Sequence, residues 1–105
     1  MVKANIVYQP NQIILDFNGH ADYADYGHDI VCSGITTAVF TTVGLLEKLA
    51  KIDKINCSEK DGYIHLEVNQ RSELIDTIIQ NLIEVLENIE RQYPENLKLE
   101  IANKE

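Results

Sequence analysis

The stretch NGHADYADYGHDIVCSGIT, residues 18–36, decides how the rest of the chain is organised. It holds three of the five glycines, and its part from Asn18 to Val31 shows no clean hydrophobic period. We therefore expect a long loop there, and a loop of that length inside a small domain is usually functional. Regular patterns on both sides of this stretch predict strands before it and a helix after it.

Two pairs of strands are predicted on either side of the helix. Val2–Tyr8 and Ile13–Phe17 alternate apolar and polar residues around a turn that contains Pro10. The same alternation occurs in Ile55–Ser58 and Tyr63–Val68. Between them lies Glu59-Lys60-Asp61-Gly62, whose Asp-Gly pair is a strong tight-turn signal. Each pair is expected to form a β-hairpin.

Two segments have a helical period. In Ile30–Ile52 the apolar stripe consists of Ile35, Val39, Val43, Leu46 and Leu49. Ser72–Tyr93 has a broader apolar face, made of Ile75, Ile78, Ile79, Leu82, Val85, Leu86 and Ile89, and Pro94 follows it. A last strand is expected at Leu97–Ile101. The order ββ-loop-α-ββ-α-β predicts an α+β fold, with two helices packed on a largely antiparallel sheet.

Composition limits the class of protein. A chain of 105 residues with 45% hydrophobic and 25% charged residues is expected to form one domain, residues 1–105. We expect no signal peptide and no apolar run that crosses a membrane, hence a cytoplasmic protein without a membrane partner. The net charge of −8, from 17 acidic and 9 basic residues, argues against direct nucleic-acid binding. Both cysteines are expected to be free thiols.

Cys32 and His20 are the candidates for nucleophile and base. With Asp29 as N-cap, Cys32 falls in the first helical turn, where the dipole favours a thiolate and free N–H groups could bind an oxyanion. His20 follows Gly19 and can be brought to Cys32 by the loop. The alternatives are a buried structural Cys32 and a surface His20.

Other residues have structural alternatives too. We rate helix capping by Asp29 above a triad role. Thr36 lies one turn beyond Cys32, where its hydroxyl either reaches the site or bonds to the preceding turn. Cys57 is expected in the core and His65 in solvent. A metal site built from the loop's donors matches no compact zinc spacing, so no metal or cofactor is expected.

The loop and helix start resemble the signature of the bacterial ribosomal-processing cysteine proteases, the Prp family. That signature reads GHA, two residues, A, two residues, G, one residue, DIVC, and usually AAVS. The matching residues are Gly19-His20-Ala21, Ala24, Gly27 and Asp29-Ile30-Val31-Cys32. Here the sequence after the cysteine is Ser33-Gly34-Ile35-Thr36, so Thr36 keeps only the hydroxyl of the family's Ser.

The resemblance implies a small cytoplasmic homodimeric endopeptidase with His20 and Cys32 as its catalytic pair. Its expected substrate is the N-terminal extension of ribosomal large-subunit protein twenty-seven. Gly19, Asp29 and Thr36 are the other signature positions, and Tyr23 and Tyr26 are expected to contact substrate. We also expect the loop to pack poorly without substrate and to close over it. The alternative is a non-enzymatic, ribosome-associated peptide-binding domain in which Cys32 is incidental.

Overall fold

A computed structural model of the protein describes residues 1–24, 29–52, 55–60 and 62–105; the side chains of residues 56 and 57 lie outside that description. The predicted order of elements is confirmed. In chain order they are β1 (Val2–Gln9), β2 (Gln12–Asn18), α1 (Ile30–Lys48), β3 (Ile55–Lys60), β4 (Tyr63–Val68), α2 (Glu73–Gln92) and β5 (Leu97–Asn103).

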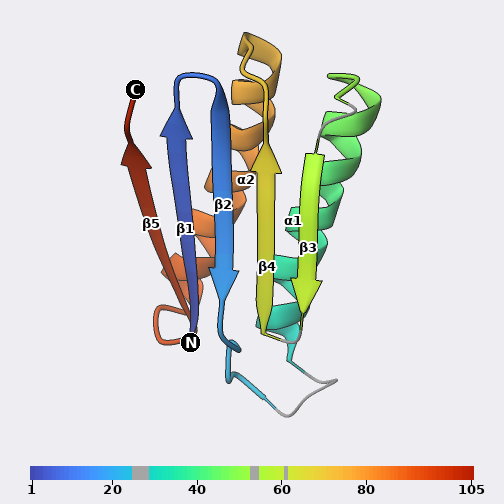
Figure 1. Cartoon of the computed structure of the whole chain (residues 1–105). Helices are drawn as coiled ribbons and strands as arrows, with labels where there is room; N and C mark the ends of the chain where they lie inside the picture. Colours follow the sequence, from blue (N-terminus) through green and yellow to red (C-terminus); the bar gives the residue numbers. More distant parts are fainter. Residues whose placement is uncertain (25–28, 53–54, 61) are drawn as a thin grey trace.

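The strands form one sheet in the order β3-β4-β2-β1-β5. Three of its pairings are antiparallel, as predicted, and β1 pairs with β5 in parallel. Both helices cover the same face of the sheet, which leaves the other face open, and β3 and β5 form its two edges (Figure 1). The fold is therefore a two-layer α+β arrangement.

The core lies between the sheet and the helices. Strand alternation turns every second side chain toward the helices, and Ile6, Leu15 and Leu66 on these positions are fully buried. From α2 the buried residues are Ile75, Ile78, Ile79, Leu82, Ile83 and Leu86. The prediction that Val85 belongs to this face is wrong: it is 39% exposed, because it lies roughly 90° around the helix from the centre of the buried stripe.

Helix α1 ends at Lys48, four residues before the predicted end at Ile52. The reason is the backbone at Lys51, whose φ of 54° lies in the left-handed region and cannot continue a right-handed helix. Ile52 is nevertheless buried, because the turn brings it back to the core, whereas Leu49 is 58% exposed. The buried apolar stripe of α1 is thus shorter than the helical pattern in the sequence predicts.

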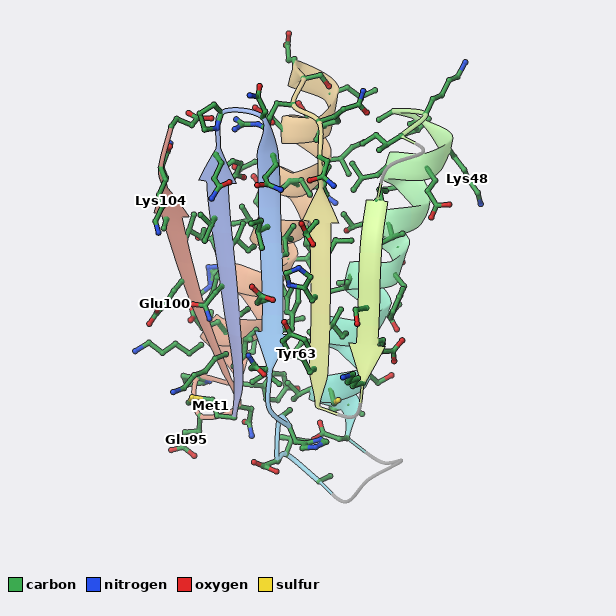
Figure 2. All side chains as sticks on the ribbon, in the orientation of Figure 1. Met1, Lys48, Tyr63, Glu95, Glu100 and Lys104 are labelled. Atoms are coloured by element: carbon green, nitrogen blue, oxygen red, sulfur yellow. The ribbon has the colours of Figure 1, made fainter. Side chains whose placement is uncertain are left out.

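The length and composition of α1 contradict the expectation that no apolar run is long enough to cross a membrane. Its mean hydropathy is 1.6 over a window of which 28% is buried. Core helices of soluble proteins also have this composition. In this fold Val31, Ile35, Val39 and Leu46 join the hydrophobic core under the sheet. Figure 2 shows Lys48 at the far end of α1, opposite the end of the molecule that carries Met1 and Glu95.

Candidate active site

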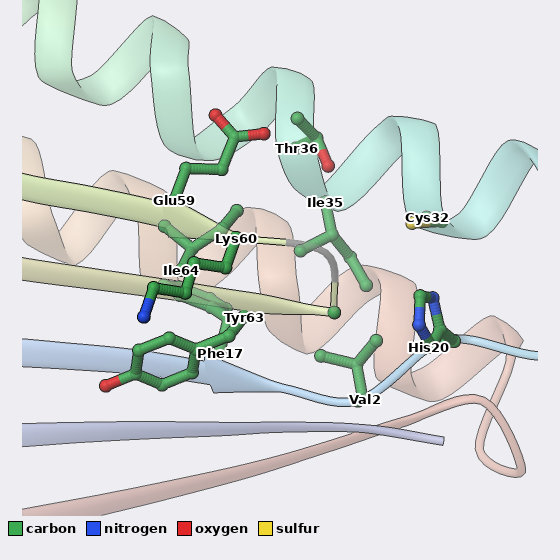
Figure 3. Close-up of a pocket in the computed structure, with 12 residues that line it drawn as sticks. Val2, Phe17, His20, Cys32, Ile35, Thr36, Glu59, Lys60, Tyr63 and Ile64 are labelled. Carbon is green, nitrogen blue, oxygen red and sulfur yellow. The ribbon is translucent and has the colours of Figure 1, made fainter.

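A cavity of about 810 Å³ opens at the end of the sheet where α1 begins. Its walls come from the start of α1, the segment that follows β2 and the turn between β3 and β4. Four of the predicted site residues line it: Gly19, His20, Cys32 and Thr36. Figure 3 shows His20 and Cys32 on neighbouring walls at the same end of this cavity. The fold therefore brings the expected base and nucleophile to one pocket.

Cys32 is placed by the N-cap of α1, and the predicted capping role of Asp29 is confirmed. Oδ1 of Asp29 accepts hydrogen bonds from the backbone N–H groups of Val31, at 3.0 Å, and Cys32, at 2.9 Å. Cys32 is a half-buried free thiol in the first helical turn. Capping therefore fixes the direction in which the helix presents this thiol.

The cap changes the expectation for an oxyanion site. The N–H groups of Val31 and Cys32 already donate to Asp29, so they are not free in this conformation. Burial acts to raise the pKa of Asp29, but hydrogen bonds from backbone N–H groups, first that of Cys32, outweigh it and hold the pKa below its usual value. An oxyanion that used these two N–H groups would have to displace the Asp29 carboxylate.

His20 is held by its glycine neighbour. Gly19 has a φ of 97°, and a Cβ there would collide with the carbonyl oxygen of Met1. Its N–H donates to the carbonyl oxygen of Gly62 over 2.7 Å, which ties the start of the loop to the β3–β4 turn. Only glycine fits this backbone, which gives a physical reason for the residue before His20.

Gly62 is a site residue that sequence reasoning missed. It has a φ of 72°, and a Cβ there would lie 2.9 Å from Nε2 of His20 and 3.3–3.4 Å from two ring carbons. The imidazole therefore lies directly against the glycine backbone. The Asp61-Gly62 pair predicts a turn, but nothing in the local sequence indicates that the turn supports a histidine 42 positions away in the chain.

Within residues 19–24, the part of the loop that the structure describes, only Ala21 is buried, in keeping with the expected poor packing, although a few contacts anchor the segment. Ala21 is fully buried, and its carbonyl oxygen accepts a hydrogen bond from Nδ2 of Asn96 over 2.8 Å. The Tyr23 ring makes an edge contact with Tyr93, and the Tyr23 N–H donates to Oδ2 of Asp29 over 3.1 Å. Tyr26, the other predicted substrate contact, lies outside the described residues.

Two other predictions concern residues away from the pocket. His65, expected in solvent, is only 26% exposed and lies on the open sheet face between Asp16 and Glu67, which contact its two ring nitrogens. Its exposure is reduced because pairing of β2 with β4 places Asp16 opposite it, while Glu67 lies two residues along the same strand on the same face. The Cys57 side chain, expected in the core, lies outside the described residues.

A metal centre finds no support among the residues that the structure describes. Within residues 1–24, 29–52, 55–60 and 62–105, no three His, Cys, Asp or Glu side chains are grouped so that they could hold an ion. Asp25 and His28 of the loop lie outside these ranges.

Residues 1–98 match the family model for the cysteine protease Prp. The chain belongs to this family. Two relatives called ribosomal processing cysteine protease Prp agree with the match. The one from Staphylococcus aureus strain Mu50 is 35% identical over 89 residues, which are 83% of this chain and 82% of the relative. The one from Bacillus subtilis strain 168 is 34% identical over 110 residues and covers 94% and 96% of the two chains.

Solved structures have the same fold. A Prp protease from Staphylococcus aureus, crystallised with a covalently linked product peptide, superposes with a TM-score of 0.83 at 28% identity, over 96% of this chain and 99% of the other. A Streptococcus mutans protein superposes with a TM-score of 0.80 at 23% identity, over 99% and 96%. The predicted Prp resemblance is confirmed, and the protein is a cysteine protease rather than a non-enzymatic binding domain.

Proposed function

We propose that this Prp-family protease removes the N-terminal extension of ribosomal large-subunit protein twenty-seven during ribosome maturation. Cys32 is the nucleophile and His20 its base. The observation that carries the proposal is the placement of both side chains on one cavity at the start of α1. The names of the relatives, which describe ribosomal processing, support the substrate class.

The reaction begins with the Cys32 thiol, whose proton passes to His20. The thiolate attacks the scissile carbonyl carbon, the carbon–nitrogen bond breaks, and His20 returns the proton to the leaving amine. This step leaves an acyl-enzyme, in which the substrate carbonyl is bonded to the Cys32 sulfur. His20 then takes a proton from water, which attacks the thioester and releases the carboxylate product and the thiol.

The neighbouring residues hold this pair in place. Gly19 and Asp29 are positioning residues, because they fix the backbones of His20 and Cys32. Thr36 lines the cavity one turn after Cys32, where its hydroxyl can reach a substrate carbonyl. We propose that Tyr23 and Tyr26 contact the substrate side chains that lie beside the loop.

The test is intact mass spectrometry of the extended ribosomal protein after incubation with the enzyme. The wild-type protein should produce one N-terminal cleavage, and Cys32→Ala should produce none while keeping its fold. His20→Ala should lower the turnover rate by about 10²- to 10⁴-fold. Cys57→Ala is the matched control and should retain activity. Full turnover by Cys32→Ala would refute the proposed nucleophile.

A well-folded but inactive Cys57→Ala would show that the wrong thiol was assigned. Alkylation at neutral pH provides an independent readout, because an activated Cys32 should react much faster than Cys57. Equal slow labelling of both thiols would contradict an activated Cys32.

We also propose a cytoplasmic homodimer, on the family resemblance alone. Sedimentation equilibrium of the purified protein should give twice the chain mass. A monomer at micromolar concentration that cleaves at the full rate would contradict this proposal.

A further inference from the structure

Glu59 occupies an unusual position in the sheet. It lies in β3, an edge strand, and pairs with Ile64 of β4. Ile64 is only 8% exposed and belongs to the hydrophobic core on the helix side of the sheet. Directly paired residues point to the same face, so the Glu59 carboxylate is on the helix-facing side, where alternation would place an apolar residue.

The same carboxylate is part of the cavity that holds Cys32 and His20. Figure 3 shows the Glu59 side chain reaching from β3 toward α1, on the side where Thr36 lies. The apolar side chains of Val2, Phe17 and Ile35 also line the cavity, while Glu59 itself is exposed. Its carboxylate can therefore meet a cationic side chain of a peptide that lies along the cavity.

Lys60 does not neutralise Glu59 from the neighbouring position. Lys60 also lines the cavity, but it pairs with Tyr63, whose hydroxyl donates to Asp16 on the open face of the sheet, so Lys60 leaves the strand in the opposite direction from Glu59. Among the ion pairs that the structure describes, none includes Glu59. Its charge is therefore available to a bound peptide.

We infer that Glu59 is a specificity-determining residue that binds a Lys or Arg side chain of the substrate, a few residues from the scissile bond. The inference rests on the proposed Cys32-dependent peptidase activity. The net charge of −8 favours the approach of a basic peptide, and Glu59 gives that attraction a fixed position in the same cavity, away from the end that holds Cys32.

An inward-pointing charge on an edge strand has a second physical explanation. Such a charge discourages pairing with the edge of another sheet. In that role Glu59 would protect against aggregation, and its replacement would leave the preferred cleavage sequence unchanged. The two explanations therefore differ in a measurable quantity.

The experiment profiles cleavage of a synthetic library of short peptides of diverse sequence, with cut sites read by mass spectrometry. Among the peptides that the wild-type enzyme cuts, Lys or Arg should be enriched at one fixed number of residues from the cleaved bond. Glu59→Gln should lose that enrichment, and Glu59→Lys should shift it toward Asp and Glu. Glu84→Gln removes the same charge from an exposed position on α2, outside the cavity, and should keep the wild-type profile.

The size of the Glu59 effect on kcat/KM is then measured with one cleaved peptide that carries the basic residue. Replacing that residue by Gln should lower kcat/KM for the wild-type enzyme by about fivefold, the upper range for an exposed ion pair. The same replacement should have no effect on Glu59→Gln, and the wild-type difference should shrink as salt is raised. Thermal unfolding checks that Glu59→Gln, a near-isosteric change, folds as the wild-type chain does.

The outcomes distinguish a failure of the Glu59 role from a failure of the proposed peptidase activity. Robust cleavage without Lys or Arg enrichment, or with the same enrichment in Glu59→Gln, overturns the role of Glu59 and leaves the peptidase intact. Cleavage no greater than that of the Cys32→Ala blank overturns the proposed function together with this inference. If Glu59→Lys does not fold, the comparison between Glu59→Gln and Glu84→Gln decides.

Discussion

Replacing Gly62 by Ala should displace the His20 ring and leave the His20 residue itself unchanged. The new Cβ would lie 2.9 Å from Nε2, well inside the 3.4 Å at which ordinary contacts begin, so the ring must move by about 0.5 Å. Because misplacement by 1 Å can cost 10²-fold, we expect kcat to fall roughly tenfold to hundredfold. The φ of 72° adds about 1–2 kcal/mol of backbone strain for any residue with a Cβ.

Two further variants separate the contact from the strain. Gly62→Asn keeps the Cβ, but Asn tolerates left-handed backbone, so it should lose turnover as Gly62→Ala does and lose less stability. Gly44→Ala is the control, because a Cβ at Gly44 meets no atom within 4 Å. It should leave kcat unchanged and raise stability by about 0.5–1 kcal/mol, since Gly44 lies in a helix interior.

The assays are steady-state cleavage of a peptide substrate and urea unfolding of each variant. Wild-type kcat for Gly62→Ala, measured on a folded protein, would refute the idea that the β3–β4 turn holds the imidazole of His20, the proposed base. Equal stability losses for Gly62→Ala and Gly62→Asn would show that Asn does not relieve the backbone strain at this position. They would contradict the explanation of the stability loss by left-handed backbone strain.

Three further predictions concern the cap, the pocket hydroxyl and the open sheet face. Asp29→Ala should lower the free energy of unfolding by about 1 kcal/mol, whereas Asp29→Asn keeps the capping oxygen and should change it by less than about 0.5 kcal/mol in urea titrations. Thr36→Ser should retain kcat and Thr36→Val should lower it; unchanged kinetics for the Val variant would leave only a packing role. Hydrogen bonds to Asp16, and then to Glu67, raise the pKa of His65, so its stabilisation is complete below the unfolded pKa of about 6.5 and is lost as pH rises through the higher folded pKa. His65→Gln should therefore destabilise the protein by up to roughly 1 kcal/mol at pH 5.5 and by much less at pH 9, and equal losses at both values would contradict the linkage.

Local patterns predicted most of the elements because each depends on neighbours in the sequence. Alternation predicts the strands, the 3.6-residue period predicts both helices, and the side-chain chemistry of Asp29 predicts the N-cap of α1. The end of α1 was missed because the left-handed turn at Lys51 overrides a continuing apolar pattern.

Contacts between distant segments carried no local signal. The parallel pairing of β1 with β5 depends on where α2 delivers the last strand, which no periodicity encodes. The contacts of Gly62 with His20 and of Asp16 with His65 arise in the same way, from the pairing of β2 with β4. The motif and the Prp resemblance indicate the candidate dyad together with Gly19 and Asp29, whereas the contact of Gly62 with His20 is visible only in the fold.

The parallel pairing of β1 with β5 also bears on the order in which the protein becomes active. Val2 pairs with Leu97, so this ladder closes almost the whole chain into a loop, and contacts of such long sequence separation form late during folding. Two anchors of the segment after His20, Tyr93 and Asn96, lie just before β5. A chain in which the hairpins and α1 have formed but β5 has not docked would therefore hold both candidate reactive side chains, while the segment after His20 lacked these two anchors. We therefore expect peptidase activity to appear only after β5 has docked.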